Sequence, residues 1–180
     1  LGGMSSGSPD VTGTSWATTP MVADMLTNPE QDGNNGDLAW GLYPTTTGDM
    51  ATRVQAMLDA GFQGASYASI QDNLDEYFIV NYFGEADYLG PGTSGVPGHI
   101  PGAFQFTPYA SLDADQMLQN LPTDQTIVVY CWTGQHSSQI PAVLNMLGYD
   151  AKSLAYGSNN LFHSSLTGPT WSVAAMMDFE

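Results

Sequence analysis

The 180-residue chain is long enough to bury one hydrophobic core without disulfides or metals, but it is too short for two full domains. Its formal net charge is −16, with only Arg53 and Lys152 as basic residues, and such a surface repels nucleic acid because it cannot neutralise phosphates. The single cysteine, Cys131, excludes an internal disulfide and a multi-cysteine metal site, and no apolar run is long enough to span a membrane.

Residues 1–48 are expected to form an irregular arm. They are rich in Gly, Ser, Thr, Asn and Pro, with two short apolar stretches. We expect the arm to pack on a single domain formed by residues 49–180, because its apolar side chains are too many for a free tail and too few for an independent core. These side chains are Trp16, Leu26, Trp40 and Tyr43. Because the chain begins at Leu1 with a stretch rich in Gly and Ser, an exported (periplasmic or extracellular) form is slightly favoured over a cytoplasmic one.

From residue 49 onward, the hydrophobic pattern predicts alternating helices and strands. Apolar residues recur at helical spacing from Met50 to Leu58, and Gly61 ends that helix. Residues 77–82 form a continuous apolar run typical of a strand buried on both faces, whereas residues 90–98 are largely Gly and Pro and predict a loop. The predicted elements are a helix over 49–60, strands over 77–82 and 104–106, a helix over 112–121, a strand over 127–130, a helix over 137–147 and a strand over 151–154. This alternation predicts an α/β fold with a largely parallel, doubly wound sheet.

The cysteine lies where a β-branched run stops and a helical pattern starts, in the stretch TIVVYCWTGQHSS of residues 126–138. Sites in parallel sheets form where the carboxyl ends of strands meet helix N-termini. Gly134 can turn successive N–H groups inward as an anion-binding nest, and Ser137 or Ser138 is expected to cap the helix. Backbone amides and a helix dipole stabilise a thiolate, so this position favours a nucleophilic Cys131. The alternative is an inert buried thiol at the end of a strand.

Two motifs resemble the signatures of rhodanese-like sulfurtransferase domains. The first is Ile127-Val-Val-Tyr-Cys131-x-Thr-Gly-x-x-Ser137, followed by a helix, Leu147-Gly-Tyr149, a strand and Gly157; the second is Gly98-His-Ile-Pro-Gly-Ala103, and Trp171 stands at the place of a closing Trp. The resemblance covers roughly residues 49–172. It implies a central, mostly parallel five-stranded sheet flanked by helices, and a cysteine that accepts a sulfane sulfur as a persulfide and passes it to a thiophilic acceptor.

The resemblance also implies roles for individual residues. Cys131 would be the catalytic nucleophile, and the substrate-binding residues would be Trp132, Thr133, Gly134, Gln135, His136 and Ser137, with the amides of residues 132–136 stabilising the outer sulfur. No metal or cofactor is implied. The implied partners are a small sulfane-sulfur donor or a protein thiol acceptor. The related phosphatases and arsenate reductases use a longer loop that ends in Arg, whereas Ser137 occupies the corresponding place here.

The chain departs from the family pattern in its charges. Many members that use thiosulfate carry Arg or Lys in the cysteine loop, but this loop offers Gln135 and His136, so thiosulfate is not expected to be the natural donor. Residues 81–83 (Asn-Tyr-Phe) stand where the family has Asp-x-Arg, which removes a usual ion pair near the loop. A non-catalytic binding or sensing module with the same pocket is therefore the alternative to a sulfurtransferase.

Other polar candidates have simpler interpretations. His99 is expected to hold the Gly-His-Ile-Pro-Gly-Ala turn by a hydrogen bond, and His163 to be a surface or packing residue. The stretch 32–37 lacks the Glu of a calcium loop and is interpreted as a turn. The methionines at apolar helical positions are predicted to fill the core; they are Met25, Met50, Met57, Met117 and Met146.

Overall fold

The computed structural model describes residues 50–90, 98–113, 117–163, 166–168 and 170–171. The predicted arm over residues 1–48, the turn at 32–37, Met25, and residues 91–97 of the predicted loop lie outside the described residues. The boundary between arm and domain therefore stays a prediction.

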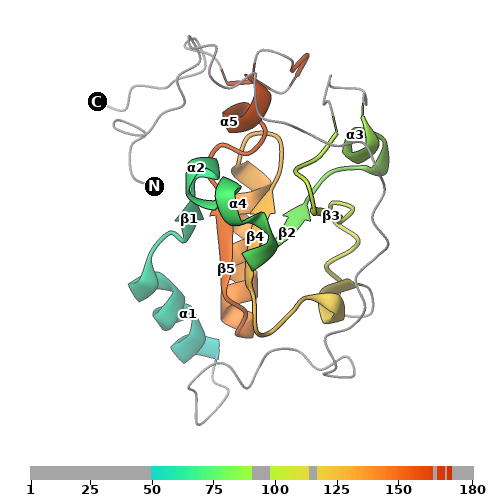
Figure 1. Cartoon of the computed structure of the whole chain (residues 1–180). Helices are drawn as coiled ribbons and strands as arrows, with labels where there is room; N and C mark the ends of the chain where they lie inside the picture. Colours follow the sequence, from blue (N-terminus) through green and yellow to red (C-terminus); the bar gives the residue numbers. More distant parts are fainter. Residues whose placement is uncertain (1–49, 91–97, 114–116, 164–165, 169, 172–180) are drawn as a thin grey trace, which may run out of the picture.

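The described residues form an α/β fold around one parallel sheet of five strands, as predicted (Figure 1). The strand order is β1-β5-β4-β2-β3, so β4 lies at the centre between β5 and β2. The strands are β1 (Gly64–Ala65), β2 (Tyr77–Asn81), β3 (Phe104–Gln105), β4 (Thr126–Tyr130) and β5 (Ala151–Leu154). Residues 77–80 of β2 and 127–130 of β4 are apolar because these strands are covered on both faces.

Helices cover the sheet, and their packing sets the position of the cysteine loop. The helical segments are α1 (Met50–Ala60), α2 (Tyr67–Ile70), the 3-10 helix η3 (Gln71–Glu76), α3 (Glu85–Leu89), the 3-10 helix η4 (Met117–Asn120), α4 (Gln135–Leu147) and α5 (Asn159–Phe162). Helix α4 packs against β4 and β5, and α1 packs against α4. None of the helices in the described ranges is long and apolar enough to cross a membrane.

The structure confirms most of the predicted elements and corrects two of them. The predicted helix over 112–121 appears, in its described residues, only as the 3-10 helix η4. The residues before η4 form turns instead of a helix. The amides of Ala110 and Ser111 donate to the carbonyl oxygen of Thr107, and the Ser111 hydroxyl accepts a hydrogen bond from the Thr107 amide. The helix predicted from Ser137 begins earlier, at Gln135, and its N-cap is Gly134 rather than a serine.

The apolar stripe of α1 does not face the core. Met50 is 56% exposed and Leu58 is 61% exposed, so the prediction of Met50 as core filler is wrong, while Met57 and Met146 are half-buried. The reason is that α1 packs on α4 rather than on the sheet. Its buried residue is Arg53, whose Nη1 donates a hydrogen bond of 2.9 Å to the carbonyl oxygen of Met146 near the C-terminal end of α4.

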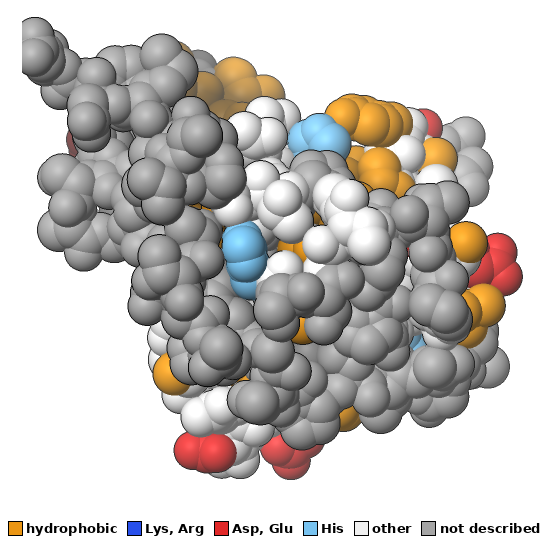
Figure 2. Space-filling model, turned by 90° about the horizontal axis from the view of Figure 1, so that it is seen from above, with side chains coloured by type: hydrophobic (Ala, Val, Ile, Leu, Met, Phe, Trp, Pro, Cys, Tyr) orange, Lys and Arg blue, Asp and Glu red, His pale blue; other side chains and the backbone are white. Residues whose placement is uncertain are grey.

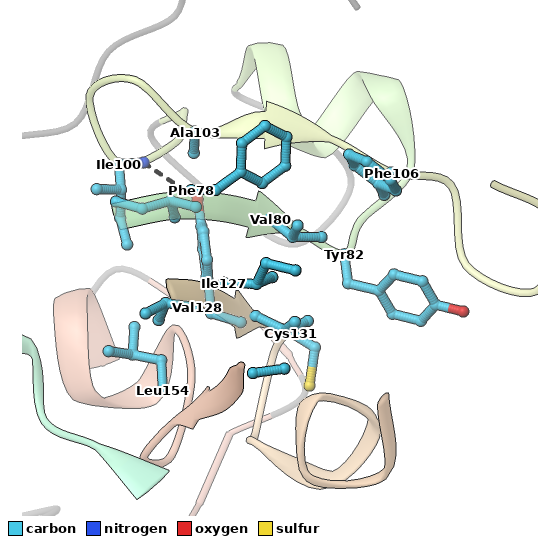
Figure 3. Close-up of a cluster of buried hydrophobic side chains, with 14 of the residues drawn as sticks. Phe78, Val80, Tyr82, Ile100, Ala103, Phe106, Ile127, Val128, Cys131 and Leu154 are labelled. Carbon is cyan, nitrogen blue, oxygen red and sulfur yellow. Dashed lines mark hydrogen bonds between the residues drawn. The ribbon is translucent and has the colours of Figure 1, made fainter. Parts of the chain in front are cut away.

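The hydrophobic core surrounds β2 and β4 (Figure 3). A polar contact links the core to the predicted turn of residues 98–103. The buried hydroxyl of Tyr130 accepts a 3.1 Å hydrogen bond from the amide of Ile100. Asn81 Nδ2 donates to the same hydroxyl at 2.7 Å. A neutral amide–phenol pair therefore links the ends of β2 and β4, near the place where residues 81–83 lack the ion pair of the family pattern. Burial raises the pKa of Tyr130 far above its ordinary value, so its hydroxyl stays neutral.

Candidate active site

Cys131 follows the last residue of the central strand β4. Its side chain is only 1% exposed, and its sulfur points out of the apolar cluster toward the beginning of α4 (Figure 3). The turn of residues 132–134 connects it to α4, which starts at Gln135. The predicted junction of a strand end and a helix N-terminus is thus present, with the thiol almost closed off from solvent.

The closest polar neighbour of the sulfur is Ser137, in the first turn of α4. Its backbone amide donates to Cys131 Sγ at 3.4 Å, and its Oγ lies 3.7 Å from Sγ. The first amides of a helix have no intrahelical acceptor, so an acceptor at this position satisfies one of them and lies at the positive end of the helix dipole. The amide contact stabilises negative charge on Sγ, whereas in the second contact the thiol donates to Ser137 Oγ.

The carbonyl groups of the loop are held on the opposite side by the segment that follows β5. The oxygen of Cys131 accepts from the Ser158 amide at 2.9 Å, that of Trp132 from Asn159 Nδ2 at 2.7 Å, and that of Thr133 from Trp171 Nε1 at 3.1 Å. In a trans peptide the N–H points opposite to the preceding C=O. The N–H groups of residues 132–134 therefore point away from the partners that hold the preceding carbonyls.

Two glycines allow the loop to lie directly on its neighbour. Gly157 has a φ of +54°, and a Cβ there would lie 2.1 Å from the carbonyl oxygen of Cys131. Gly134 has a φ of +89°, and a Cβ there would lie 3.1 Å from the backbone nitrogen of Tyr156. A larger residue at position 157 would displace the cysteine loop, so glycine is required by close approach as well as by backbone conformation.

Gln135 and His136 lie in the first turn of α4 rather than in the turn before it. The His136 ring hydrogen-bonds the hydroxyl of Tyr109 through Nε2 at 2.7 Å and meets the ring of Tyr82 edge-on at a centroid distance of 6.4 Å. Tyr109 is 78% exposed and its φ is +63°. The Trp132 ring instead packs on the ring of Phe83, at 4.4 Å between centroids. Aromatic groups thus flank the loop on both sides.

No basic side chain is seen near the loop. Figure 2 views the molecule from above, at the carboxyl ends of the strands, and this face shows His but neither Lys nor Arg among the described side chains. Arg53 bonds the far part of α4, and Lys152 lies within β5. Dipoles of the backbone, rather than charged side chains, therefore provide the positive potential at Cys131.

The other histidines have structural contacts, as predicted. His99 is 1% exposed, stacks on the ring of Tyr88 at 3.6 Å, and bonds the Tyr88 carbonyl through Nδ1 at 2.8 Å. His163 is half-buried and its Nε2 lies 2.7 Å from the carbonyl oxygen of Trp171. Within the described ranges, no group of three or more His, Cys, Asp or Glu residues could hold a metal ion.

Comparison with protein families agrees with this geometry. The family model described as rhodanese-like domain matches residues 72–162, just over half of the chain, including both motifs and the loop of Cys131. The chain belongs to the rhodanese-like domain family. No curated protein sequence matches it.

Several solved structures are similar to this rhodanese-like domain. A rhodanese-related protein from Thermoplasma volcanium is 17% identical with a TM-score of 0.43, over 53% of this chain and 86% of that one. A protein from Staphylococcus saprophyticus subsp. saprophyticus is 18% identical with a TM-score of 0.45, over 59% of this chain and 100% of that one. A NAD-dependent persulfide reductase from A. fulgidus is 20% identical with a TM-score of 0.41, over 59% of this chain and 17% of that one.

Sequence reasoning missed three residues that this rhodanese-like domain places around the loop. Asn159 binds the Trp132 carbonyl, Tyr109 binds His136, and Ser153 of β5 lies 3.2 Å from Ser137, Oγ to Oγ. Of these, Ser153 carried a detectable signal, because a hydroxyl in a strand that is predicted to lie within the sheet needs a hydrogen-bond partner where it is buried. The other two are brought to the loop by chain segments without a regular pattern.

Proposed function

We propose that this protein is a sulfurtransferase or sulfur carrier that forms a persulfide on Cys131. The Cys131 thiolate attacks the outer sulfur of a sulfane donor, so that a new S–S bond forms to Sγ while the S–S bond within the donor breaks and its remainder leaves with the electron pair. A thiophilic acceptor, such as a thiolate, then attacks the transferred sulfur and releases Cys131 as a thiolate. Oxidation states balance over the cycle, and no cofactor is needed.

The arrangement around Sγ is the observation that carries the proposal. The Ser137 amide lies 3.4 Å from Sγ, at the N-terminus of a 13-residue helix. The carbonyls of residues 131–133 are hydrogen-bonded on the other side, which leaves the amides of residues 132–134 for a terminal sulfur. Preorganised amides of this kind stabilise charge that develops during a reaction without having to reorient. The same arrangement supports the roles proposed for Trp132, Thr133, Gly134, Gln135, His136 and Ser137.

The charges favour an uncharged or protein-bound donor over thiosulfate. The net charge is −16, and the loop contributes His136 and Gln135 rather than Arg or Lys. A dianion is repelled by such a protein during its approach, whereas a neutral donor is not. The aromatic rings of Trp132, Tyr82 and Tyr109 add apolar surface beside the loop. We therefore propose a persulfide carried by another protein, or an organic persulfide in its protonated, uncharged form, as the donor.

Mass spectrometry of the intact protein tests the proposal directly. The protein is incubated with polysulfide, with a low-molecular-weight persulfide, or with thiosulfate, and freed of donor. A mass increase of one sulfur atom is expected on the unmodified chain and not on Cys131→Ser, because Cys131 is the chain's single cysteine. Loss of the added sulfur on incubation with cyanide or a thiol shows transfer. No adduct with any of the three donors would contradict the proposal.

The near-complete burial of the thiol supports a second candidate, a non-catalytic binding or sensing module. Cys131 is 1% exposed and belongs to the hydrophobic core cluster, as expected of a structural thiol. Alkylation distinguishes the candidates. A module with an inert thiol leaves Cys131 unmodified by iodoacetamide until the protein unfolds, whereas a carrier reacts in the folded state at neutral pH.

A further inference from the structure

Two buried hydroxyl groups lie in series behind the sulfur of Cys131. Ser137 Oγ is 3.7 Å from Sγ, and Ser153 Oγ is 3.2 Å from Ser137 Oγ. Ser137 is 0% exposed and Ser153 is 1% exposed, so bulk water does not reach either. The hydrogen bond between them can run in either direction, since each hydroxyl can donate or accept.

The position of Ser153 is set by the sheet. It lies in β5, in register with Val129 of the neighbouring β4 and with Gly64 of β1, and α4 packs against this part of the sheet. A hydroxyl buried here without a partner would cost about 1–3 kcal/mol. Among the described residues, Ser137 Oγ is the side-chain partner of Ser153 Oγ. The Ser153 hydroxyl is therefore best explained by its contact with Ser137.

The hydrogen bonds that link Cys131, Ser137 and Ser153 can form whether Cys131 is a thiol or a thiolate. With a thiol, S–H donates to Ser137 Oγ, and Ser137 O–H donates to Ser153 Oγ. With a thiolate, both bonds reverse: Ser153 O–H donates to Ser137 Oγ, and Ser137 O–H donates to the negative sulfur. The second arrangement is the stronger one, because a hydrogen bond to a charged acceptor is about twice as strong as a neutral one and donors in series polarise one another.

We propose that Ser153 is a positioning residue for the Cys131 nucleophile, acting through Ser137 to favour the thiolate. This inference rests on the proposed function, since it assigns Ser153 to the reaction in which Cys131 attacks sulfur. Ser153 does not touch the reacting atom itself. Its hydroxyl determines which way the Ser137 hydroxyl points when Cys131 loses its proton.

A third buried serine provides a matched control. Ser158 is 0% exposed and lies in the turn whose backbone holds the Cys131 carbonyl, but its Oγ has no hydrogen-bond partner among the described residues. Ser158→Ala therefore removes a buried hydroxyl near the loop without touching the series of Cys131, Ser137 and Ser153.

The test is the rate of alkylation of Cys131 by iodoacetamide as a function of pH, followed by intact mass in the full chain. Iodoacetamide is uncharged and reacts with the thiolate, and Cys131 is the single cysteine. Ser153→Ala is expected to slow alkylation at pH 7 by roughly three- to ten-fold and to move the midpoint of the pH profile upward by roughly half to one unit. Ser153→Thr, which keeps the hydroxyl, is expected to restore the profile, and Ser158→Ala to leave the midpoint where it is.

A double variant with Ser137→Ala and Ser153→Ala distinguishes a positioning role of Ser153 from a purely structural one. If Ser153 acts through Ser137, adding Ser153→Ala to Ser137→Ala changes the alkylation rate no further. Thermal unfolding of each variant reports any loss of stability separately. A Ser153→Ala midpoint equal to the Ser158→Ala midpoint, or two effects that simply add in the double variant, overturns the proposal. Because alkylation requires no sulfur donor, a shifted profile without persulfide formation would refute the proposed function alone.

Discussion

Replacing Gly157 by alanine should displace the cysteine loop, and the structure gives the size of the effect. An L-residue at a φ of +54° costs about 1–2 kcal/mol. The new Cβ would lie 2.1 Å from the Cys131 carbonyl oxygen, whereas ordinary contacts begin at 3.4 Å, so this oxygen must move by about 1.3 Å. Such a movement breaks its 2.9 Å hydrogen bond from Ser158, which adds roughly 1–3 kcal/mol. We expect a total loss of about 2–5 kcal/mol.

Gly61→Ala is the matched control for the backbone strain. Gly61 also has a positive φ, of +68°, but a Cβ there would have no neighbour within 4 Å. This variant should lose only the strain, about 1–2 kcal/mol. Urea unfolding gives the free energy of each variant, and alkylation of Cys131 in the folded state reports displacement of the loop. Equal free-energy losses in Gly157→Ala and Gly61→Ala, with unchanged alkylation, would refute the inference that close approach fixes the loop.

Three further predictions concern charge, pH and the N-terminal arm. Tyr130→Phe should lower the free energy of unfolding at pH 7 by about 1–3 kcal/mol, because the Ile100 amide loses its acceptor. Burial raises the pKa of Tyr130 above 10, so the folded chain keeps this proton when the unfolded chain loses it; stability should fall above pH 10 by up to about 1.4 kcal/mol per pH unit, and less steeply in Tyr130→Phe, as measured by urea unfolding. His136→Arg should raise kcat/KM for thiosulfate about ten-fold over His136→Gln at low salt, and this ratio should shrink as salt rises; equal rates in both variants and the unmodified protein would make loop charge irrelevant. Deleting residues 1–45 should lower the Tm measured by calorimetry if the arm packs on the domain, and an unchanged Tm would contradict that packing.

The sequence predicts the centre of the sheet well because its signals there are local. Residues 77–80 of β2 and 127–130 of β4 are apolar, and this pattern is typical of a short strand covered on both faces. The two residues of β1 and the four of α2 are too short for any periodicity to develop. Their structure follows from pairing and packing with distant parts of the chain.

In the candidate site, too, the residues close to Cys131 in the sequence are predictable and the distant ones are not. Cys131 and the loop after it are predictable because their chemistry depends on neighbours in sequence. The partners of that loop are not, since Ser158, Asn159 and Trp171 reach its carbonyls through contacts across 27–38 residues. The position of Arg53 could not be predicted for a related reason. Its charge predicts an exposed side chain, but the carbonyl of Met146, near the end of α4, accepts a hydrogen bond from it.

The contact of Arg53 with α4 has a consequence for how the site responds to ionic strength. Its guanidinium bonds the Met146 carbonyl, near the negative end of the helix, and the positive end lies about 20 Å away at Cys131. The chain's single arginine thus neutralises the negative pole of the helix and leaves its positive pole uncompensated at Cys131, instead of meeting the incoming molecule. Mobile ions screen charges at the surface but not buried peptide dipoles. Reaction with an uncharged donor should consequently be almost independent of salt, while an anionic donor should react faster as salt screens the acidic surface.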